Sequence, residues 1–263
     1  MEQIKYYMAP MEGVTGYVYR NAYAKYYGGI ERYFTPFVAN KKLGHREKND
    51  VCPEHNAGMA VVPQILTNRA EDFLAIAEIL REYGYDTVNL NLGCPSGTVA
   101  ARGRGAGFLA MPDELDHFLE EIFEKCPLRI SIKTRIGKEN PAEWERLLAI
   151  YEKYPLEELI VHPRVQTDFY KNRVNLEAFA LAEKNSRHSL CYNGDIVDAA
   201  SAAHIREGFP SVDKFMIGRG LIKHPWLLEE LSGGRQEKQE RKERFFRFHN
   251  AILELSLIHI SEP

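Results

Sequence analysis

The chain has 263 residues, which is enough for one large barrel or two small domains. Its 44% apolar and 27% charged residues are ordinary for a globular protein, and no apolar run approaches the roughly 20 residues of a membrane span. The net charge of −3 argues against a generic polyanion binder but leaves room for a local basic face.

Short β-rich apolar runs alternate with longer helical patterns from the start of the chain to about residue 225. The runs predict eight strands, at Tyr6–Ala9, Ile30–Phe34, Ala60–Ile65, Thr87–Leu90, Ile130–Lys133, Leu159–Val161, Leu190–Tyr192 and Lys214–Ile217. Helices are predicted between them at Ala70–Tyr83, Pro112–Lys125, Ala142–Lys153 and Leu176–Lys184. This alternation predicts an α/β fold, a (β/α)8 TIM barrel over residues 1–228. A doubly wound open sheet is the competing fold, but no G-x-G-x-x-G fingerprint follows the first strand.

The pattern changes after Pro225. Gly233 and Gly234 mark a break, and a charged helix is predicted from Arg235 onward. The apolar face of this helix consists of Phe245, Phe246, Phe248, Ile252 and Leu253. Such a face needs a partner surface, and no segment that could provide one follows in the sequence. The last nine residues, 255–263, match residue for residue the translation of a transposase adapter used in sequencing libraries. We therefore expect 255–263 to be a non-native tail and the helical segment 229–254 to be truncated.

Four cysteines, Cys52, Cys94, Cys126 and Cys191, form no C-x-x-C pair and no metal-ligand spacing, so no metal site is predicted. The first five residues lack the basic and apolar regions of a signal peptide. A cytoplasmic, monomeric protein without a membrane segment is expected, and in a reducing compartment Cys94 can stay a free thiol.

The most informative segment is Asn89-Leu-Asn-Leu-Gly-Cys-Pro-Ser-Gly-Thr98, which runs on into a second glycine-rich stretch, 102–107. It places Cys94 directly after an apolar strand, where α/β barrels carry out chemistry. The alternative is a buried cysteine in a tight turn, since free cysteine is often a small core residue.

Polar residues end nearly every predicted strand, and in a barrel these ends meet at one rim. Asn193-Gly-Asp195 and Gly218-Arg219-Gly220 end the last two strands, where such barrels usually bind phosphate. Lys133 would face the middle of the ligand, to bond an anionic heterocycle or to form a Schiff base. A flat phosphorylated cofactor fits this rim, and FMN is the leading candidate.

These motifs resemble the tRNA-dihydrouridine synthase family. The resemblance rests on Ala9-Pro-Met-x-Gly-Val-Thr15, Gln64, Asn89-x-Asn-x-Gly-Cys-Pro95, Lys133, His162, Asn193-Gly-Asp195 and Gly218-Arg219, and covers about residues 4–228. It implies an FMN barrel followed by a helical tRNA-binding domain, of which 229–254 would be the start. It also implies that NADPH reduces the flavin, that hydride reaches C6 of a uracil in tRNA, and that a cysteine protonates C5.

The resemblance implies a role for each matching residue. Cys94 would be the proton donor. The implied FMN-binding residues are Pro10, Met11, Glu12, Gln64, Lys133, His162, Asn193, Gly194, Asp195, Gly218 and Arg219. Residues expected in rim loops or beside Cys94 would contact the RNA: Asn91, Arg102, Arg104, Arg135 and Arg164.

The chain departs from the family pattern at Gly16, where many members carry Asp; this predicts a looser first loop between strand and helix. His162-Pro-Arg164 replaces the commoner His-Gly-Arg, with His and Arg kept. The truncation expected in the helical segment predicts weak tRNA binding.

Three other functions stay open. The chain could be an FMN barrel oxidoreductase acting on a free pyrimidine, as in a dihydroorotate dehydrogenase-like enzyme, for which the basic rim would be incidental. A Schiff-base aldolase would use Lys133 and no flavin. A non-catalytic RNA-binding protein would keep its RNA affinity without Cys94.

Overall fold

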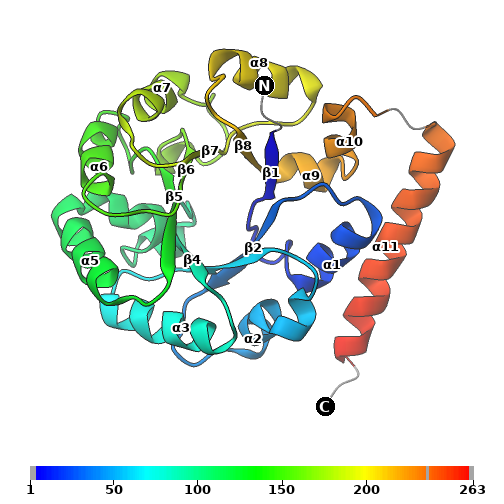
Figure 1. Ribbon diagram of the computed structural model, residues 1–263, viewed down its shortest axis with the longest axis horizontal. Coiled ribbons are helices and arrows are strands. Elements are labelled where there is room, and N and C mark those ends of the chain that lie inside the picture. Colours follow the sequence, from blue (N-terminus) through cyan, green and yellow to red (C-terminus); the bar gives the residue numbers. More distant parts are fainter. Residues whose placement is uncertain (1–3, 235–236, 261–263) are drawn as a thin grey trace.

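The computed structural model describes residues 4–234 and 237–260, with side chains of the last helix up to residue 256. Its parallel strands close into a barrel in the order β1 to β8, surrounded by helices (Figure 1). The strands are β1 Lys5–Met8, β2 Arg32–Val38, β3 Val61–Ile65, β4 Thr87–Leu92, β5 Arg129–Arg135, β6 Leu159–His162, β7 Leu190–Tyr192 and β8 Lys214–Ile217. The predicted TIM barrel is confirmed, and the open sheet is excluded because β1 pairs with β8.

Helices follow the strands around the barrel. They are α1 Tyr17–Tyr26, α2 His45–Val51, α3 Ala70–Glu82, α4 Gly97–Ala100, α5 Pro112–Lys125, α6 Glu143–Tyr151, α7 Leu176–Asn185, α8 Ala199–Gly208, α9 Arg219–Lys223, α10 Leu227–Leu231 and α11 Lys238–Ile260. Short 3-10 turns lie at Pro53–Asn56, Gly105–Ala110 and Gln166–Asp168. The predicted bounds of β7, β8 and α5 coincide with those observed.

The largest boundary error concerns β2, which was predicted to end at Phe34. The strand continues through Pro36 to Val38, and its register against β3 shifts between Phe34 and Phe37. This irregularity accommodates the proline, which cannot donate a ladder hydrogen bond. Proline is therefore a poor marker of the end of this strand.

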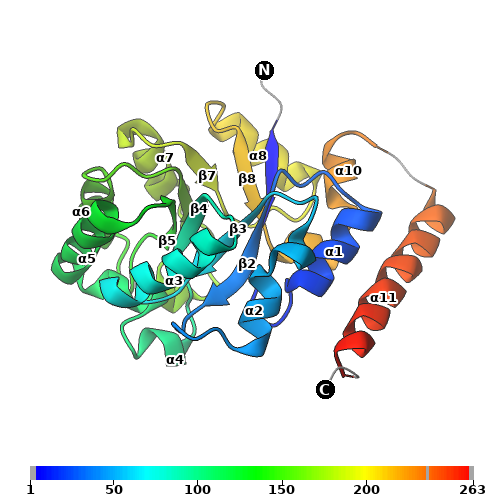
Figure 2. The ribbon, with the colours of Figure 1, turned by 60° about the horizontal axis from the view of Figure 1, so that its bottom comes forward.

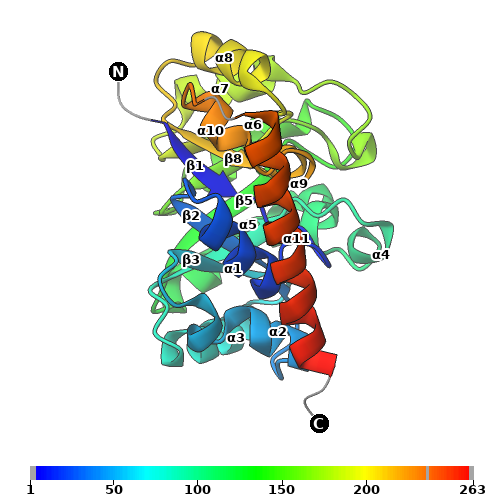
Figure 3. The ribbon, with the colours of Figure 1, turned by 90° about the vertical axis from the view of Figure 1, so that its right-hand side faces the viewer.

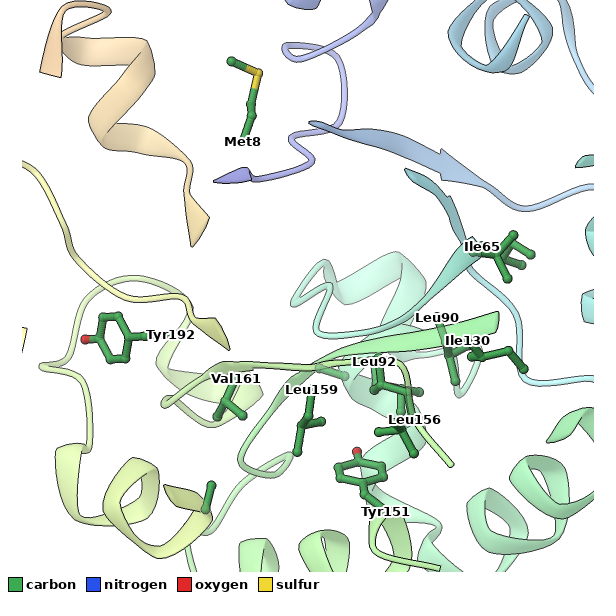
Figure 4. Packing of buried hydrophobic residues seen from close by; sticks show 14 of the residues in the cluster. Met8, Ile65, Leu90, Leu92, Ile130, Tyr151, Leu156, Leu159, Val161 and Tyr192 are labelled. Atoms are coloured by element: carbon green, nitrogen blue, oxygen red, sulfur yellow. The ribbon is translucent and has the colours of Figure 1, made fainter. Parts of the chain in front are cut away.

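Alternation along the strands divides the core into two layers. On β4, Val88, Leu90 and Leu92 pack outward against the helices, as Figure 4 shows for the two leucines. Asn89 and Asn91 lie between them in the sequence and point to the opposite face, into the barrel. The same period places the polar residues of β4 inside the barrel, beneath its carboxyl-terminal mouth.

Helix α11 runs alongside α1 outside the ring of barrel helices (Figures 2 and 3). Phe248 is 3% exposed and lies edge-on to the rings of four tyrosines, Tyr19, Tyr23, Tyr26 and Tyr27, with centroids 5.2–6.5 Å away. Ion pairs from Arg241 to Glu230 and from Arg244 to Glu229 add further contacts to α10.

The prediction that the apolar face of this helix lacks a partner is therefore wrong, because the partner, α1, precedes it by more than 200 residues. Phe245, Phe246 and Leu253 of that face stay exposed. Of the expected tail 255–263, residues 255–260 continue α11 and residues 261–263 lie outside the described residues. None of the described helices is both long and apolar enough to cross a membrane.

Candidate active site

The loop after β4 holds Cys94 from two sides. Below it, the side-chain oxygen of Asn91 accepts hydrogen bonds from the backbone N–H groups of Gly93 (3.0 Å) and Cys94 (2.9 Å). Above it, the backbone N–H of Ala106 donates to the carbonyl of Cys94 at 3.1 Å. Gly105 has φ +56°, and a Cβ there would lie 3.0 Å from the Cβ of Cys94. The glycine-rich sequence thus allows the loop to close tightly over the cysteine.

The Cys94 thiol is partly buried, and burial raises its pKa above the ordinary value. The backbone N–H of Ser96 and the charges of Lys133 and Arg135 oppose this shift without reversing it. The thiol is therefore protonated at neutral pH. A protonated thiol fixed at the barrel mouth can act as a general acid.

A chain of buried amides lies beneath this loop. The side chain of Asn91 donates to Gln64, Gln64 donates to Asn89, and Asn89 donates to the Ser131 hydroxyl, at 2.7, 2.7 and 2.8 Å. Each link fixes the orientation of the next, so Asn91 presents its oxygen to the Cys94 loop. Gln64 is fully buried and retains one further donor and one further acceptor position.

A cavity of about 70 Å3 opens at the carboxyl ends of β1, β5, β6, β7 and β8. The residues that line it are Ala9, Pro10, Met11, Lys133, His162, Tyr170, Asn193, Gly194, Asp195, Gly218 and Arg219. The structure thus brings together all the predicted cofactor-binding residues except two, Glu12 and Gln64. The carboxylate of Glu12 is paired with Arg46 instead.

The charges around this cavity favour an anionic ligand. Asp195 is ion-paired with both Arg164 and Arg219, so these three groups together carry one net positive charge. Lys133 lines the same cavity, and burial, followed by the charge of Arg135, lowers its pKa to about 8. The lysine is still mostly protonated at pH 7. The cavity therefore presents excess positive charge to a ligand.

His162 is neutral, because burial first and then the surrounding cations lower its pKa well below the ordinary value. Its Nε2 lies 3.0 Å from Nη1 of Arg164. Because a guanidinium only donates, Nε2 accepts and Nδ1 carries the proton. The ring therefore keeps one N–H donor for a ligand.

Two of the arginines that were expected to contact the RNA from rim loops are buried instead. Arg135 and Arg164 are at most 2% exposed. Arg135 donates to the carbonyls of Gly93 (3.1 Å), Val165 (2.8 Å) and Phe169 (2.7 Å), and Arg164 donates to that of Asn172 (2.7 Å). That expectation is wrong because their donors hold the loops after β4 and β6. Arg102 is exposed and Arg104 half-buried, both in the loop after β4.

The first loop, after β1, is not loosened by Gly16. Gly16 is the N-cap of α1 and offers no side-chain acceptor, but the Asp50 carboxylate accepts a hydrogen bond from the Tyr17 N–H at 2.7 Å. Asp50 belongs to α2, so the cap is supplied by a different helix. The predicted loosening is wrong, and nothing in the local sequence around Gly16 could have indicated this partner.

Sequence reasoning also missed Tyr170, which lies in the loop between β6 and α7 and lines the cavity. Loop residues lack the periodicity that identifies strand ends, so no pattern distinguished it from its neighbours. Asn89 was part of the Cys94 motif, but its partner Ser131 carried no signal of its own.

A closed parallel barrel with polar and charged residues gathered at the carboxyl ends of its strands has the architecture in which TIM-barrel enzymes carry their active sites. The family model described as dihydrouridine synthase (Dus) matches residues 7–259, and the chain belongs to this family. The family resemblance predicted from the motifs is thereby confirmed.

Curated relatives agree with this assignment. The chain is 26% identical over 226 residues to tRNA-dihydrouridine synthase B of Pasteurella multocida, and the alignment covers 84% of the chain and 67% of the relative. It is 27% identical over 232 residues to the probable tRNA-dihydrouridine synthase 2 of Bacillus subtilis, with 85% and 70% covered. It is 28% identical over 240 residues to a probable tRNA-dihydrouridine synthase of Staphylococcus aureus, with the same coverage.

Solved structures share the fold. A variant of NCR from Zymomonas mobilis aligns with a TM-score of 0.57 and 14% identity, covering 89% of this chain and 88% of that one. A morphinone reductase mutant in complex with tetrahydroNAD aligns with a TM-score of 0.60 and 14% identity, covering 87% and 86%. At this identity the likeness concerns the barrel architecture alone.

Proposed function

We propose that this protein reduces uridines in tRNA to 5,6-dihydrouridine, with FMN bound in the cavity, NADPH as the reductant and Cys94 as the proton donor. The observation that carries the proposal is the protonated thiol of Cys94, held from both sides after β4 and close enough to Lys133 of the cavity for that charge to act on its pKa. Membership of the dihydrouridine synthase family supports the reaction and its tRNA substrate.

The residues of the cavity fit FMN. Gly194 lines the cavity, and a Cβ there would lie 2.1 Å from the Tyr192 hydroxyl, so glycine at this position lets the loop after β7 pack closely against Tyr192. The guanidinium of Arg219 stands beside it and can meet the phosphate. Lys133 can stabilise negative charge on the ring system, while Pro10 and Met11 line it along their backbone.

FMN, when bound, supplies the hydride that C6 of the uracil accepts. The chain supplies the proton: the S–H bond of Cys94 breaks, a C–H bond forms at C5, and the resulting thiolate is later reprotonated from solvent. Lys133 and Arg135 lie close enough to stabilise that thiolate, since both charges lower the pKa of Cys94. The net reaction consumes one hydride and one proton and saturates the C5–C6 bond.

The target base must leave the RNA stack to reach the mouth, which costs a few kcal/mol. We propose that Asn91, at the base of the Cys94 loop, also contacts the uracil. Arg102 and Arg104 are proposed to contact the RNA outside the cavity, and segment 229–254 is proposed to begin a helical tRNA-binding domain.

The direct test is the visible absorption spectrum of the purified protein before and after incubation with FMN. We expect bound flavin, with bands shifted from those of free FMN, and weaker retention in a Gly194→Ala variant. A protein that binds no flavin under either condition would overturn the proposal. Incorporation of dihydrouridine into unmodified tRNA by the loaded protein tests the substrate.

A further inference from the structure

The loop between β6 and α7 carries two adjacent aromatic residues with different surroundings. Phe169 and Tyr170 are 43% and 50% exposed, but only Tyr170 lines the cavity. Phe169 has φ +50°, and among the described residues it alone has a positive φ without being glycine. This backbone conformation is unfavourable for a bulky residue and persists only where the surroundings enforce it. The chain therefore turns sharply at Phe169, immediately before Tyr170.

Buried cations enforce this conformation. Arg135 donates to the carbonyls of Val165 and Phe169 at 2.8 and 2.7 Å, and Arg164 donates to that of Asn172 at 2.7 Å. These bonds connect the strand ends to both sides of the loop. The position of Tyr170 is therefore set by the barrel rather than by the loop alone.

The ring of Tyr170 stands among charged and aromatic groups of the cavity. The Arg219 guanidinium lies over the ring, 4.5 Å from its centroid, and that of Arg135 lies 5.3 Å away. The imidazole of His162 lies 6.0 Å away at an interplanar angle of 28°. Cation–π attraction holds the ring over the end of the cavity that Arg219 and Asp195 form.

We propose that Tyr170 closes the cavity over the bound flavin and slows its release. The inference rests on the proposed function, because it takes FMN as the ligand. The ring is half-exposed and stacks on Arg219, so it would lie between solvent and a phosphate bound beside that guanidinium. A flavin must displace the ring to leave, and the ring's attraction to two guanidiniums opposes that movement.

The experiment measures the FMN dissociation rate of the full chain by stopped-flow fluorescence, with excess apoflavodoxin as a trap for released flavin. Tyr170→Ala is expected to release FMN roughly fivefold to thirtyfold faster, the range that loss of a partly desolvated cation–π contact implies. Tyr170→Phe keeps the ring and both cation–π contacts but loses the hydroxyl, which interacts with Arg135, so its release rate should lie between those of wild type and Tyr170→Ala. Phe169→Ala is the matched control, because that side chain is similarly exposed and does not line the cavity.

Unchanged release from Tyr170→Ala and from a second variant, Tyr170→Leu, would overturn the inference while leaving FMN binding intact. An unchanged rate together with a raised KM for tRNA would assign the ring to the RNA and also overturn it. A wild-type chain that binds no FMN would overturn the proposed function and this inference together. Equal acceleration by Phe169→Ala and Tyr170→Ala would show general loosening of the loop and contradict a role for the ring.

Discussion

Asp50 supports the first loop of the active site from outside, and replacing it with alanine should destabilise the barrel. Its carboxylate caps α1 through the Tyr17 N–H and lies 3.7 Å from the guanidinium of Arg20, with both side chains almost completely buried. Met11 and Pro10, six and seven residues before Tyr17 in the sequence, line the cavity. Loss of the cap should therefore affect both stability and ligand binding.

The magnitude follows from two contributions. Removing an N-cap side chain costs about 1 kcal/mol, and leaving a buried partner charge costs about 3–5 kcal/mol. Arg20 still donates to the carbonyls of Thr15 and Asp50 and to the side chain of Asn56, which reduces the second contribution. We expect Asp50→Ala to lower the free energy of unfolding by about 2–4 kcal/mol.

A compensating substitution tests the capping directly. A Cβ at Gly16 would lie 3.1 Å from Oδ1 of Asp50, so Gly16→Asp alone should destabilise through crowding and charge repulsion. In the double variant the new aspartate has room and can cap α1 itself. The double variant should therefore be more stable than Asp50→Ala by about 1 kcal/mol. Urea denaturation followed by circular dichroism measures all four proteins, and additive losses would refute the capping argument.

Three further predictions concern the thiol, the last helix and the cavity lysine. Asn91→Ala removes the acceptor for the backbone N–H groups of Gly93 and Cys94. With FMN still bound, we expect dihydrouridine formation to slow on the order of 10- to 100-fold. A rate within twofold of wild type in single-turnover assays would contradict this positioning role. Phe248→Ala should destabilise the docking of α11 by about 3–5 kcal/mol in denaturation experiments, whereas the exposed Phe246→Ala should change it by less than about 0.5 kcal/mol. Because the pKa of Lys133 is lowered to about 8, its charge is present below that pH and lost above it, so FMN affinity in titrations should fall as pH rises through about 8. A Lys133→Met variant should bind more weakly and lose this inflection; an inflection that persists would assign it to another group.

The sequence predicted the barrel and the strand-end residues because strand periodicity and rim position are local properties. Cys94, Lys133, His162 and Arg219 were all predicted as site residues for that reason. The roles of Arg135 and Arg164 depended on burial, which sequence position alone does not specify. Arg135 ends β5 and Arg164 follows β6, yet both guanidiniums are buried and donate to loop carbonyls.

Contacts between segments that are distant in the sequence also could not be predicted. Asp50 caps a helix 33 residues before it, and Phe248 packs on tyrosines more than 200 residues earlier. Neither partner has a sequence signature, because any acceptor or aromatic residue at the right place in space would serve. The fold determines these pairs, and so they became visible only in the structure.

The central claim is that Cys94 delivers the proton to C5 of the target uracil. The most direct measurement is dihydrouridine formation on unmodified tRNA by FMN-loaded Cys94→Ala, under single-turnover conditions with pre-reduced flavin, and with Cys126→Ala as the control cysteine. We expect Cys94→Ala to retain its flavin spectrum and to lose at least about 100-fold in rate, with Cys126→Ala unchanged. Wild-type turnover by Cys94→Ala would contradict the account.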